Sequence, residues 1–520
     1  MISNVEKSPL YPILNPRSIA FWGASNHFTS MGTNQLASVK DLGFEGRIYP
    51  VHPKEAEVLG LRAYKSAMDL PEVPDLAILV LPTDVVPEVM EQCGEKGIRH
   101  AIVVSGGFRE VGSDGAHLEN HVLEIAQRHG MRFLGPNCIG VANPHHKLNT
   151  TFMPHEGFPG FVGMASQSGS FITQMFNYLF RRGMGFSAGI SVGNEADVDL
   201  VDCMEYLAVC PHTKVIALYI EAVRRGRAFI DAARAVVPHK PIVAVYVGGS
   251  EAGRRASLSH TGALAGPDSL YDGALRQSGV IRADSMEELF DYCMVLGQAH
   301  RPKGGNVVIQ THSGGPGTVA ADACSRAGLE LPSLSPETRR KLSTLVPRTG
   351  SAGNPVDITY SKNPLDYFLE IPRRLLESEE ADGLLVYFLV PSHTVARVLE
   401  QSGIPGERAG REAEHIIQEQ CRLLADLVNT SDKPLLGFSL RDRRDLFIRE
   451  LQDRGVPVLA SPERAARAMA ALVRYAKVRE LFDTEDAVSS EKNGRSTKPQ
   501  DRQAGKRVSC LRKDSGQPKC

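Results

Sequence analysis

Short segments that are apolar at almost every position alternate with amphipathic helical segments along most of this chain, and no other feature limits its fold as much. An uninterrupted apolar strand is typical of a parallel sheet covered by helices on both faces, because neither side of the strand meets water. Up to about Pro144 the apolar segments are SIAFWGAS, GRIYPVHP, DLAILVLP, HAIVVSGGF and RFLGPN. The alternation predicts an α/β protein made of parallel sheets.

Breaks in this alternation divide the chain into three sheet-forming parts and a tail. We expect a Rossmann-like domain over residues 1–150, a second parallel-sheet domain over 151–300 and a third over 301–480, because 520 residues are enough for three cores. Beyond these domains apolar residues are few, and the segment from Glu491 onward contains nine Lys and Arg but only three Asp and Glu. We therefore expect residues 481–520 to be a disordered basic tail, either a solvated appendage or a segment that touches RNA or membrane.

The net charge and the cysteines indicate a cytoplasmic protein with neither nucleic acid nor membrane as a partner. The formal net charge is −1, so the chain as a whole is not attracted to an anionic surface. The nine cysteines are scattered without a CxxC pair, as is typical of a reducing compartment. The first residues contain no basic region followed by an apolar run, and no apolar segment reaches membrane-spanning length. We expect no metal site, because the adjacent histidines His145 and His146 lack other ligands at a suitable spacing.

Two glycine–serine turns each follow a predicted strand and open a predicted helix. They are GMASQSGSFITQ in the second part of the chain and VIQTHSGGPGTVAAD in the third. A helix that starts at the carboxyl end of a parallel strand presents N–H groups and the positive end of its dipole to an anion. Small residues at such a turn also permit close packing of helix on strand, and this alternative stays open for each turn. We expect the two turns to bind one phosphate from opposite sides. The predicted phosphate-binding residues are Gln167, Ser168, Gly169, Ser170, Gly314, Gly315 and Gly317.

The strand ends of the first domain predict a ligand with a phosphorylated ribose. The loop after the first strand, GASNHFTSMG, is not GxGxxG, so the dinucleotide fingerprint is missing. At the end of the second strand, PVHPK offers a cation where an NAD site has a carboxylate. Coenzyme A and NADP both carry such a phosphate, and a Rossmann-like fold without a ligand is the alternative. The expected coenzyme-binding residues are Gly23, Ala24, Ser25, Pro53, Lys54, Pro82, Gly106 and Asn137.

His260 lies among small residues and glycines in the stretch GRRASLSHTGALAG. A structural histidine usually has apolar neighbours, whereas these neighbours would leave the imidazole uncovered and the backbone free to move. A neutral imidazole is a good nucleophile near pH 7 and can hold a phosphoryl group on one ring nitrogen. Because the stretch lies between the two turns in the sequence, we predict that His260 is catalytic.

Taken together, these segments resemble the NDP-forming acyl-CoA synthetases, which include succinyl-CoA synthetase and the ADP-forming acetate–CoA ligases. SIAFWGASN, GRIYPVHPK, VVSGGFREVG and LGPNCIGVANP are similar to the CoA-binding domain of that family. ASQSGSF, YIEAVRRGRAFI, SHTGALAG, THSGGPGTVAADA and GNPVDI continue in the ligase order. The resemblance extends from Asn15 to about Glu480 and is greatest to the α subunit of the acetate–CoA ligases. It implies a Rossmann-like CoA-binding domain followed by two flavodoxin-like domains of the succinyl-CoA synthetase type.

The resemblance also assigns two catalytic residues. His260 matches the histidine that the family phosphorylates, and Glu221, at the end of VIALYIE, matches the glutamate thought to orient or stabilise the phosphohistidine. Without the resemblance, Glu221 would be a solvated strand-end residue or the ion-pair partner of Arg224 or Arg225. The chain departs from its relatives directly after the glutamate, because Ala222–Arg225 replaces a segment that commonly carries a glycine and an acidic residue.

The reaction that the resemblance implies interconverts acyl-CoA, phosphate and ADP with a carboxylic acid, CoA and ATP, through an acyl phosphate and a phosphohistidine. The chain has no Walker motif and no stretch left for an ATP-grasp fold. We therefore expect ATP or ADP and Mg²⁺ to bind a separate ATP-grasp β-type subunit of a hetero-oligomer. A non-catalytic CoA-binding or regulatory protein of the same fold is the main alternative. A protein acetyltransferase fusion would need a longer and less polar tail, and an NADP-dependent oxidoreductase would not need the histidine loop.

Overall fold

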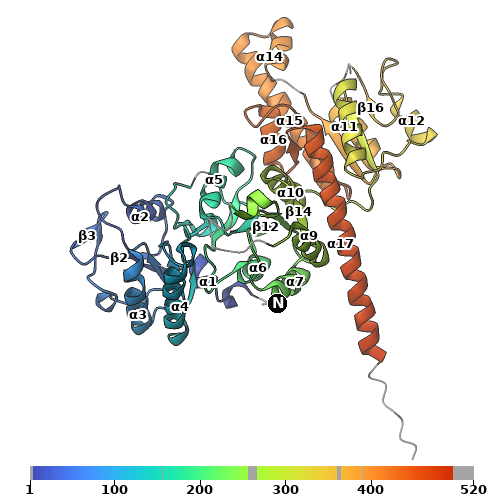
Figure 1. Ribbon diagram of the computed structural model, residues 1–520. Helices are drawn as coiled ribbons and strands as arrows, with labels where there is room; N and C mark the ends of the chain where they lie inside the picture. The colour runs from blue at the N-terminus through green and yellow to red at the C-terminus, as the bar shows by residue number, and fades with distance from the viewer. Residues whose placement is uncertain are drawn as a thin grey trace, which may run out of the picture. The chain divides into compact units, whose positions relative to one another are not determined.

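The computed structural model describes the chain except for residues 1–3, 156, 256–265, 360–362, 364, 390–391 and 496–520, and it describes no side chain at 392 or over 485–495. Residues Met1–Arg479 form one compact unit and Glu480–Cys520 form another. The first unit contains three large sheets in chain order, each covered by helices (Figure 1).

The first sheet is fully parallel, with the strand order β2-β1-β5-β6-β7. Every residue of β1 and β5 is buried, which explains why all of their residues except Ser18 are apolar. Chain order places β2 on one side of β1 and β5 on the other, so a ligand crevice is expected at the carboxyl ends of β1 and β5. The strands are β1 (Ser18–Trp22), β2 (Arg47–Val51), β5 (Leu76–Leu79), β6 (His100–Val103) and β7 (Arg132–Leu134), with a small separate pair β3 (Glu57–Val58) and β4 (Leu61–Arg62). The helices are α1 (Tyr11–Leu14), α2 (Met31–Asp41), α3 (Val86–Lys96) and α4 (Ser113–Arg128).

The second sheet has the order β14-β13-β12-β10-β11-β8-β9. Its parallel strands are β10 (Val162–Ser166), β11 (Phe186–Ser191), β12 (Val215–Ile220), β13 (Ile242–Tyr246) and β14 (Ile281–Ala283). The strands β8 (Val141–Asn143) and β9 (Leu148–Asn149) form an antiparallel hairpin, and β8 pairs with β11. We expected the first domain to extend to residue 150, but residues 141–149 belong to the second sheet. The helices are α5 (Gly169–Phe180), α6 (Leu200–Val209), α7 (Gly226–Val236), α9 (Asp268–Ser278) and α10 (Met286–Gln298).

The third sheet is again fully parallel, with the order β16-β15-β17-β18-β19. Its core includes the packed rings of Phe368, Phe388 and Phe447. The strands are β15 (Val307–Thr311), β16 (Val356–Asp357), β17 (Gly383–Tyr387), β18 (Leu435–Phe438) and β19 (Val458–Leu459). The helices are α11 (Gly314–Arg326), α12 (Pro336–Leu342), α13 (Ile371–Leu376), α14 (Ser392–Gln401), α15 (Gly406–Thr430) and α16 (Leu446–Asp453).

The last helix, α17 (Pro462–Arg495), begins after the third sheet, and its N-terminal part contacts the second domain. Its Arg464 forms an ion pair of 2.6 Å with Asp291 of α10, and its Tyr475 hydroxyl donates to the Val237 carbonyl at 3.0 Å. We expected residues 481–520 to be disordered, but α17 continues over residues 481–495, a segment without proline that can extend a preformed helix. The rest of that tail lies outside the described residues.

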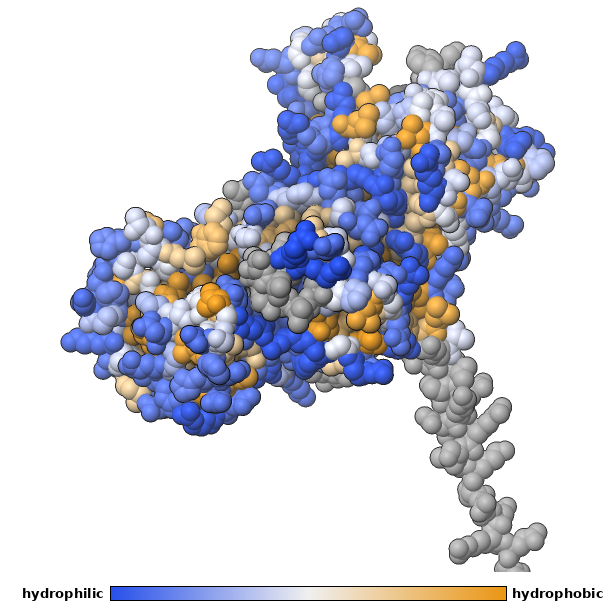
Figure 2. Space-filling view, viewed as in Figure 1, coloured by the Kyte–Doolittle hydropathy of each residue, from blue (hydrophilic) through white to orange (hydrophobic). Residues whose placement is uncertain are grey.

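No helix within the described part of the chain is long and apolar enough to cross a membrane. On the face drawn in Figure 2, hydrophobic residues form small groups among hydrophilic ones. The cysteines that the structure describes are all buried and free: Cys93, Cys138, Cys203, Cys210, Cys293, Cys324 and Cys421.

Candidate active site

The predicted coenzyme-binding residues line one edge of the first sheet. Its five strands are parallel, so their carboxyl ends lie along the same edge. The predicted residues follow those ends strand by strand: Gly23, Ala24 and Ser25 after β1, Pro53 and Lys54 after β2, Pro82 after β5, Gly106 after β6 and Asn137 after β7. The structure thus brings together a set of residues that spans more than a hundred positions of sequence.

The turn after β1 requires its glycine. Gly23 has a φ of +90°, and a Cβ there would lie 1.8 Å from the carbonyl oxygen of Val80. Gly32 in the first turn of α2 is equally close-packed, because its Cβ would lie 2.3 Å from the Gly23 carbonyl oxygen. The start of α2 therefore packs directly on the turn, as in a phosphate-binding strand–turn–helix unit.

The predicted cation is exposed at the end of β2. The backbone N–H groups of Lys54 and Glu55 donate to Nδ1 of His52, at 3.2 and 2.9 Å. These bonds hold the turn, while the side chain of Lys54 is exposed to solvent. A phosphate at this edge of the sheet could reach its ammonium group.

A polar network that the sequence did not reveal joins the first domain to the second. Nδ2 of Asn194 donates to Glu110 at 2.6 Å and to Glu119 at 2.9 Å, and Nδ2 of Asn137 donates to Oδ1 of Asn194 at 3.2 Å. The Glu110 carboxylate lies beside Gly106, where an added Cβ would be 3.3 Å from Glu110 Oε1. Two predicted coenzyme residues, Gly106 and Asn137, therefore lie at the domain junction.

The first predicted phosphate turn opens α5 as expected. Ser166 Oγ donates to the Ser168 carbonyl at 2.7 Å and accepts from the Ser168 N–H at 3.2 Å. Helix α5 then begins at Gly169, with Ser170 exposed in its first turn. A Cβ on Gly169 would lie 2.9 Å from the Ile139 side chain, so this glycine also permits close packing of helix α5.

The side chain of Gln167 connects three loops and does not point to a ligand. Its Oε1 accepts from the N–H groups of Glu221 and Ala222 at 2.6 and 3.0 Å. Its Nε2 donates to the Glu195 carboxylate and to the Ala222 carbonyl, both at 2.7 Å. The amide of Gln167 thus fixes the backbone at the end of β12 and orients a carboxylate after β11.

Glu221 is buried at the carboxyl end of β12, with 4% of its surface exposed. This burial argues against the solvated strand-end alternative. The two arginines that could have paired with it bind elsewhere: Arg225 pairs with Asp199 and Asp202, and Arg224 donates to the Glu195 carbonyl. The Glu221 carboxylate is therefore not a surface group, and both neighbouring arginines bind other partners.

Glu195 is a second buried carboxyl group here, and the sequence did not single it out. It is 4% exposed, has a φ of +55°, and accepts from Gln167 and from the backbone N–H of Leu200, at 2.7 and 2.9 Å. Burial raises the pKa of Glu195 to about 7, opposed by the Gln167 hydrogen bond. A carboxyl group with a pKa near neutrality beside a candidate catalytic glutamate is typical of functional sites.

His260 itself lies outside the described residues, but the chain on both sides of it is described. A Cβ on Gly249 would lie 2.3 Å from Oδ1 of Asp268, so the two ends of the 250–267 segment are adjacent. After the gap, the Gly266 carbonyl accepts from the Tyr246 hydroxyl at 2.8 Å. Tyr246 stacks on Tyr271, whose hydroxyl accepts from the N–H of Val223 at 3.1 Å. The histidine segment thus leaves and re-enters the fold beside the loop that carries Glu221.

The second predicted turn repeats the geometry of the first. Thr311 Oγ1 donates to the Ser313 carbonyl at 2.8 Å and accepts from its N–H at 3.0 Å, as Ser166 does with Ser168. Helix α11 begins at Gly314, and both Gly314 and Gly315 are exposed. Gly317 is buried, and its Cβ would lie 2.8 Å from the Thr311 side chain, so its place is in the packing of the helix.

The two turns are not joined by any hydrogen bond, ion pair or ring contact between described residues. Their convergence on one phosphate stays a prediction. Within the same described part of the chain, no three His, Cys, Asp or Glu side chains are grouped as metal ligands. His145, one of the adjacent histidines, instead stacks on His212 with ring centroids 3.9 Å apart.

Comparison with known proteins follows the same three-domain division. Residues 17–144 match the model of a CoA-binding domain, residues 159–296 that of a succinyl-CoA ligase-like flavodoxin domain, and residues 307–396 that of a ligase-CoA domain. Together these matches cover more than half of the chain.

Individual relatives match nearly the whole chain. The α subunit of ADP-forming acetate–CoA ligase II from Pyrococcus furiosus is 38% identical, over 89% of this chain and 97% of its own length. ADP-forming acetate–CoA ligase I from Archaeoglobus fulgidus is 37% identical, and this chain spans only 63% of that longer protein. The dinucleotide-forming acetyl-coenzyme A synthetase 1 of Candidatus Korarchaeum cryptofilum is similar in structure, with a TM-score of 0.80 at 30% identity over 92% of this chain and 99% of that one. Its complex with phosphate and ADP gives a TM-score of 0.79 at 31% identity, over 92% and 98% of the two chains.

Proposed function

This chain belongs to the NDP-forming acyl-CoA synthetases, in the family of ADP-forming acetate–CoA ligase α subunits, and from that membership we propose that it binds CoA and carries the phosphohistidine of an acyl-CoA synthetase. The reaction interconverts acyl-CoA, phosphate and ADP with a carboxylic acid, CoA and ATP. It is an acid–thiol ligase reaction, and the acyl group is that of a small carboxylic acid.

CoA binds along the carboxyl edge of the first sheet. Lys54, exposed after β2, is suited to the 3′-phosphate of the ribose, and the glycine turn after β1 admits the phosphates close to the backbone. Gly106 and Asn137 follow the far strands of the sheet, at the junction with the second domain. A CoA molecule that extends along this edge therefore directs its thioester toward the loop of Glu221.

The position of Glu221 is the observation that carries the proposal. Its carboxylate is buried, its backbone is held by Gln167 at the start of α5, and the ends of the His260 segment meet the same loop. A carboxylate placed there can orient the imidazole of His260 and stabilise its phosphorylated form. The same loop thus supports a residue that receives a phosphoryl group and a group that fixes its ring.

The chemistry proceeds by two displacements on this chain. Phosphate attacks the thioester carbonyl, the carbon–sulfur bond breaks, and CoA leaves as thiolate to give an acyl phosphate. A ring nitrogen of His260 then attacks the phosphorus, and the carboxylate leaves as the bond between phosphorus and the acyl oxygen breaks. The N–H groups at the start of α5, at Gly169 and Ser170, stabilise the phosphoryl oxygens, and those of Gly314 and Gly315 are proposed to do so from the other side.

The last transfer takes place on a partner. The phosphoryl group of His260 passes to the terminal phosphate of ADP, which forms ATP and restores the neutral imidazole. The names of the Pyrococcus relatives denote subunits, which supports a partner for this chain as well. We place the nucleotide and its Mg²⁺ on an ATP-grasp β-type subunit in a hetero-oligomer.

Phosphate labelling tests the proposal. The chain is incubated with radioactive phosphate and a panel of acyl-CoA thioesters, and acid-labile label on the protein is counted. We expect label on the wild-type chain, none on His260→Ala, and at least tenfold less on Glu221→Gln, with CoA binding unchanged in both. His117→Ala, which removes an exposed histidine of α4, should label like the wild type.

Two outcomes would contradict this assignment. Labelled His260→Ala would show that another residue accepts the phosphoryl group. A wild-type chain that binds CoA but takes no label from any thioester, nor from ATP and Mg²⁺ in the presence of its partner, would favour a non-catalytic CoA-binding protein.

A further inference from the structure

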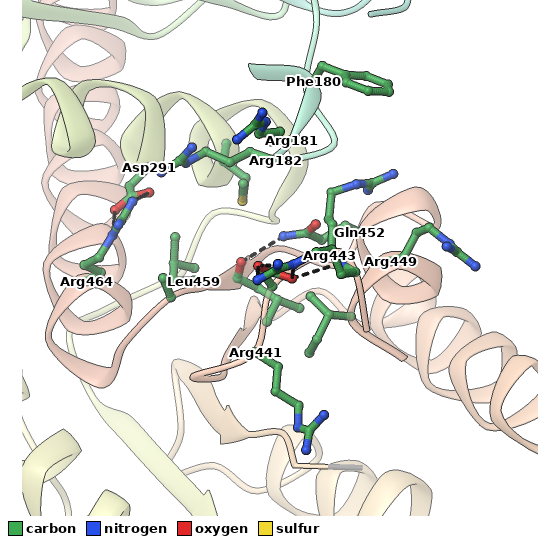
Figure 3. Close-up of a pocket in the computed structure, with 16 residues that line it drawn as sticks. Phe180, Arg181, Arg182, Asp291, Arg441, Arg443, Arg449, Gln452, Leu459 and Arg464 are labelled. Atoms are coloured by element: carbon green, nitrogen blue, oxygen red, sulfur yellow. Dashed lines mark hydrogen bonds and ion pairs between the residues drawn. The ribbon is translucent and has the colours of Figure 1, made fainter. Parts of the chain in front are cut away.

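A cavity of about 760 Å³ lies between the second and third domains, away from the strand ends described above (Figure 3). The C-terminal end of α5 and helix α10 form one wall, and the β18–α16 loop, helix α16 and the end of β19 form the other. Helix α5 has 12 residues, or about 18 Å of helix, between this wall and the turn at Gly169. The cavity is therefore distinct from the proposed reaction site.

The cavity is lined by seven arginines and only two aspartates, Asp291 and Asp442. The arginines come from both walls: Arg181, Arg182, Arg441, Arg443, Arg444, Arg449 and Arg464. Such a concentration of guanidinium groups is unfavourable unless carboxylates or a bound anion neutralise it. The ion pairs of each arginine therefore decide how much positive charge is left for a ligand.

Four of the seven have carboxylate partners. Arg464 pairs with Asp291 at 2.6 Å, and Arg444 pairs with Asp442 at 2.7 Å. Arg441 and Arg443 pair with Asp445 and Asp453, at 3.0 and 2.8 Å.

The other three arginines have no such partner. Within the part of the chain that the structure describes, no carboxylate lies within ion-pair distance of Arg181, Arg182 or Arg449. Arg182 lies over the ring of Tyr178, 3.6 Å from its centroid, which holds the guanidinium in place without neutralising it. Asp291, already paired with Arg464, also attracts Arg182 electrostatically. Because seven arginines face only four paired carboxylates, the cavity still keeps a net positive charge contributed by both walls.

Two buried polar atoms in the lining also lack partners in the described structure. Gln452 is 8% exposed and donates to the Val458 carbonyl at 3.0 Å, but its Oε1 accepts no hydrogen bond. Nη1 of Arg443 donates to no group, and it lies against Gly183, where an added Cβ would be only 2.4 Å away. A buried polar group without a partner is costly, so a ligand or ordered water that supplied one would be stabilised here.

The rest of the lining is apolar. Phe180, Met294, Ile448 and Leu459 contribute hydrocarbon surface to the same cavity. Arginines suit phosphate groups because their guanidinium forks bind two oxygens at once, whereas the apolar residues suit an organic moiety. The volume is also in the usual range for small-molecule sites.

We propose that this cavity binds a phosphorylated organic anion of nucleotide size, with its phosphates on Arg181, Arg182 and Arg449. The anion would link α5 of the second domain to α16 of the third. Its site would be separate from the CoA edge and from the His260 loop, so the inference does not depend on the proposed reaction.

Equilibrium binding by isothermal titration calorimetry tests the site, with inorganic tripolyphosphate and ADP as separate probes of the full chain. The variants Arg181→Gln and Arg449→Gln remove exposed, unpaired cations and should leave the fold intact. Each variant should bind tripolyphosphate and ADP with at least fivefold lower affinity than the wild type. Arg340→Gln, which removes an exposed arginine from α12, is the matched control and should change affinity less than twofold. Tighter binding of ADP than of tripolyphosphate would assign the apolar lining to the nucleoside.

Equal affinities for all four proteins, or no binding to the wild type, would overturn the proposal. If the wild type binds neither probe, and Arg181→Gln and Arg449→Gln fail to co-purify with the partner subunit, the arginines form a protein–protein interface. The proposal of a small-molecule site is then wrong. Loss of the site would leave the labelling of His260 unaffected, and failure of that labelling would leave these affinities unaffected, so the two proposals fail separately.

Discussion

Replacing Glu195 by glutamine should remove a pH-dependent loss of stability in the second domain. Burial raises the pKa of this carboxyl group to about 7 in the folded chain, from an ordinary value of 4.5. Between these two values the folded chain holds a proton that the unfolded chain has lost, so stability decreases as pH rises from about 4.5 to 7. With about 1.4 kcal/mol for each pH unit between the two pKa values, the decrease amounts to about 3 kcal/mol.

Urea denaturation at pH 5, 6, 7 and 8, followed by circular dichroism, measures this effect in wild type and in Glu195→Gln. The free energy of unfolding of the variant, relative to wild type, should increase by about 2.5 kcal/mol from pH 5 to pH 8, because a part of the decrease already occurs below pH 5. The lost hydrogen bonds to Gln167 and Leu200 lower the stability of the variant by the same amount at pH 5 and at pH 8. This fixed cost therefore does not affect the comparison. Glu124→Gln on the exposed face of α4 should follow the wild type.

An infrared titration reports the same proton directly. The difference spectrum between wild type and Glu195→Gln should contain a protonated carboxyl band that disappears with a midpoint near pH 7. If that band is absent above pH 6, or if the two proteins have parallel stability curves, the pKa of Glu195 is not raised and the reasoning fails.

Three further predictions concern the proposed active site. Lys54→Ala should weaken the binding of CoA about tenfold but leave the binding of dephospho-CoA nearly unchanged, because the lost contact is to the 3′-phosphate. Equal weakening of the binding of both ligands in a titration would contradict this. Gln167→Leu should lower the free energy of unfolding, measured in urea, by roughly 2–4 kcal/mol, because the N–H groups of Glu221 and Ala222 lose their acceptor. A decrease below 0.5 kcal/mol, the usual limit for a surface change, would show that the hydrogen bonds of Gln167 are dispensable. The purified chain alone should bind CoA but make no ATP from acyl-CoA, phosphate and ADP, and full turnover without a partner in a luminescence assay for ATP would refute the need for one.

The sequence was informative where a strand is buried on both faces. Segments such as those of β1, β5 and β10 are buried throughout and almost entirely apolar, so both the strands and the edge where their carboxyl ends meet could be predicted. The hairpin β8–β9 was missed because its strands have three and two residues and include polar side chains such as Asn143 and Asn149. Strands of that length have no periodicity to detect.

The candidate site was predictable only in its local parts. Turns and strand ends depend on neighbours in sequence, so the starts of α5 and α11 could be placed. Glu195 and Glu110 could not, because their environment depends on distant residues: Gln167 for Glu195, and Asn194 for Glu110. Burial and cross-domain hydrogen bonds of this kind leave no short-range pattern in the sequence.

The hairpin β8–β9 also determines where this chain can be divided. If the chain were cut at residue 150 to isolate the CoA-binding part, that fragment would retain two strands that belong to the next sheet. In the remainder, β11 would become an exposed edge strand with the hydrogen-bonding groups of Gly189 and Ile190 unpaired. Such an edge is a template for pairing with other chains, so both fragments should aggregate, whereas a cut near residue 136 keeps each sheet whole.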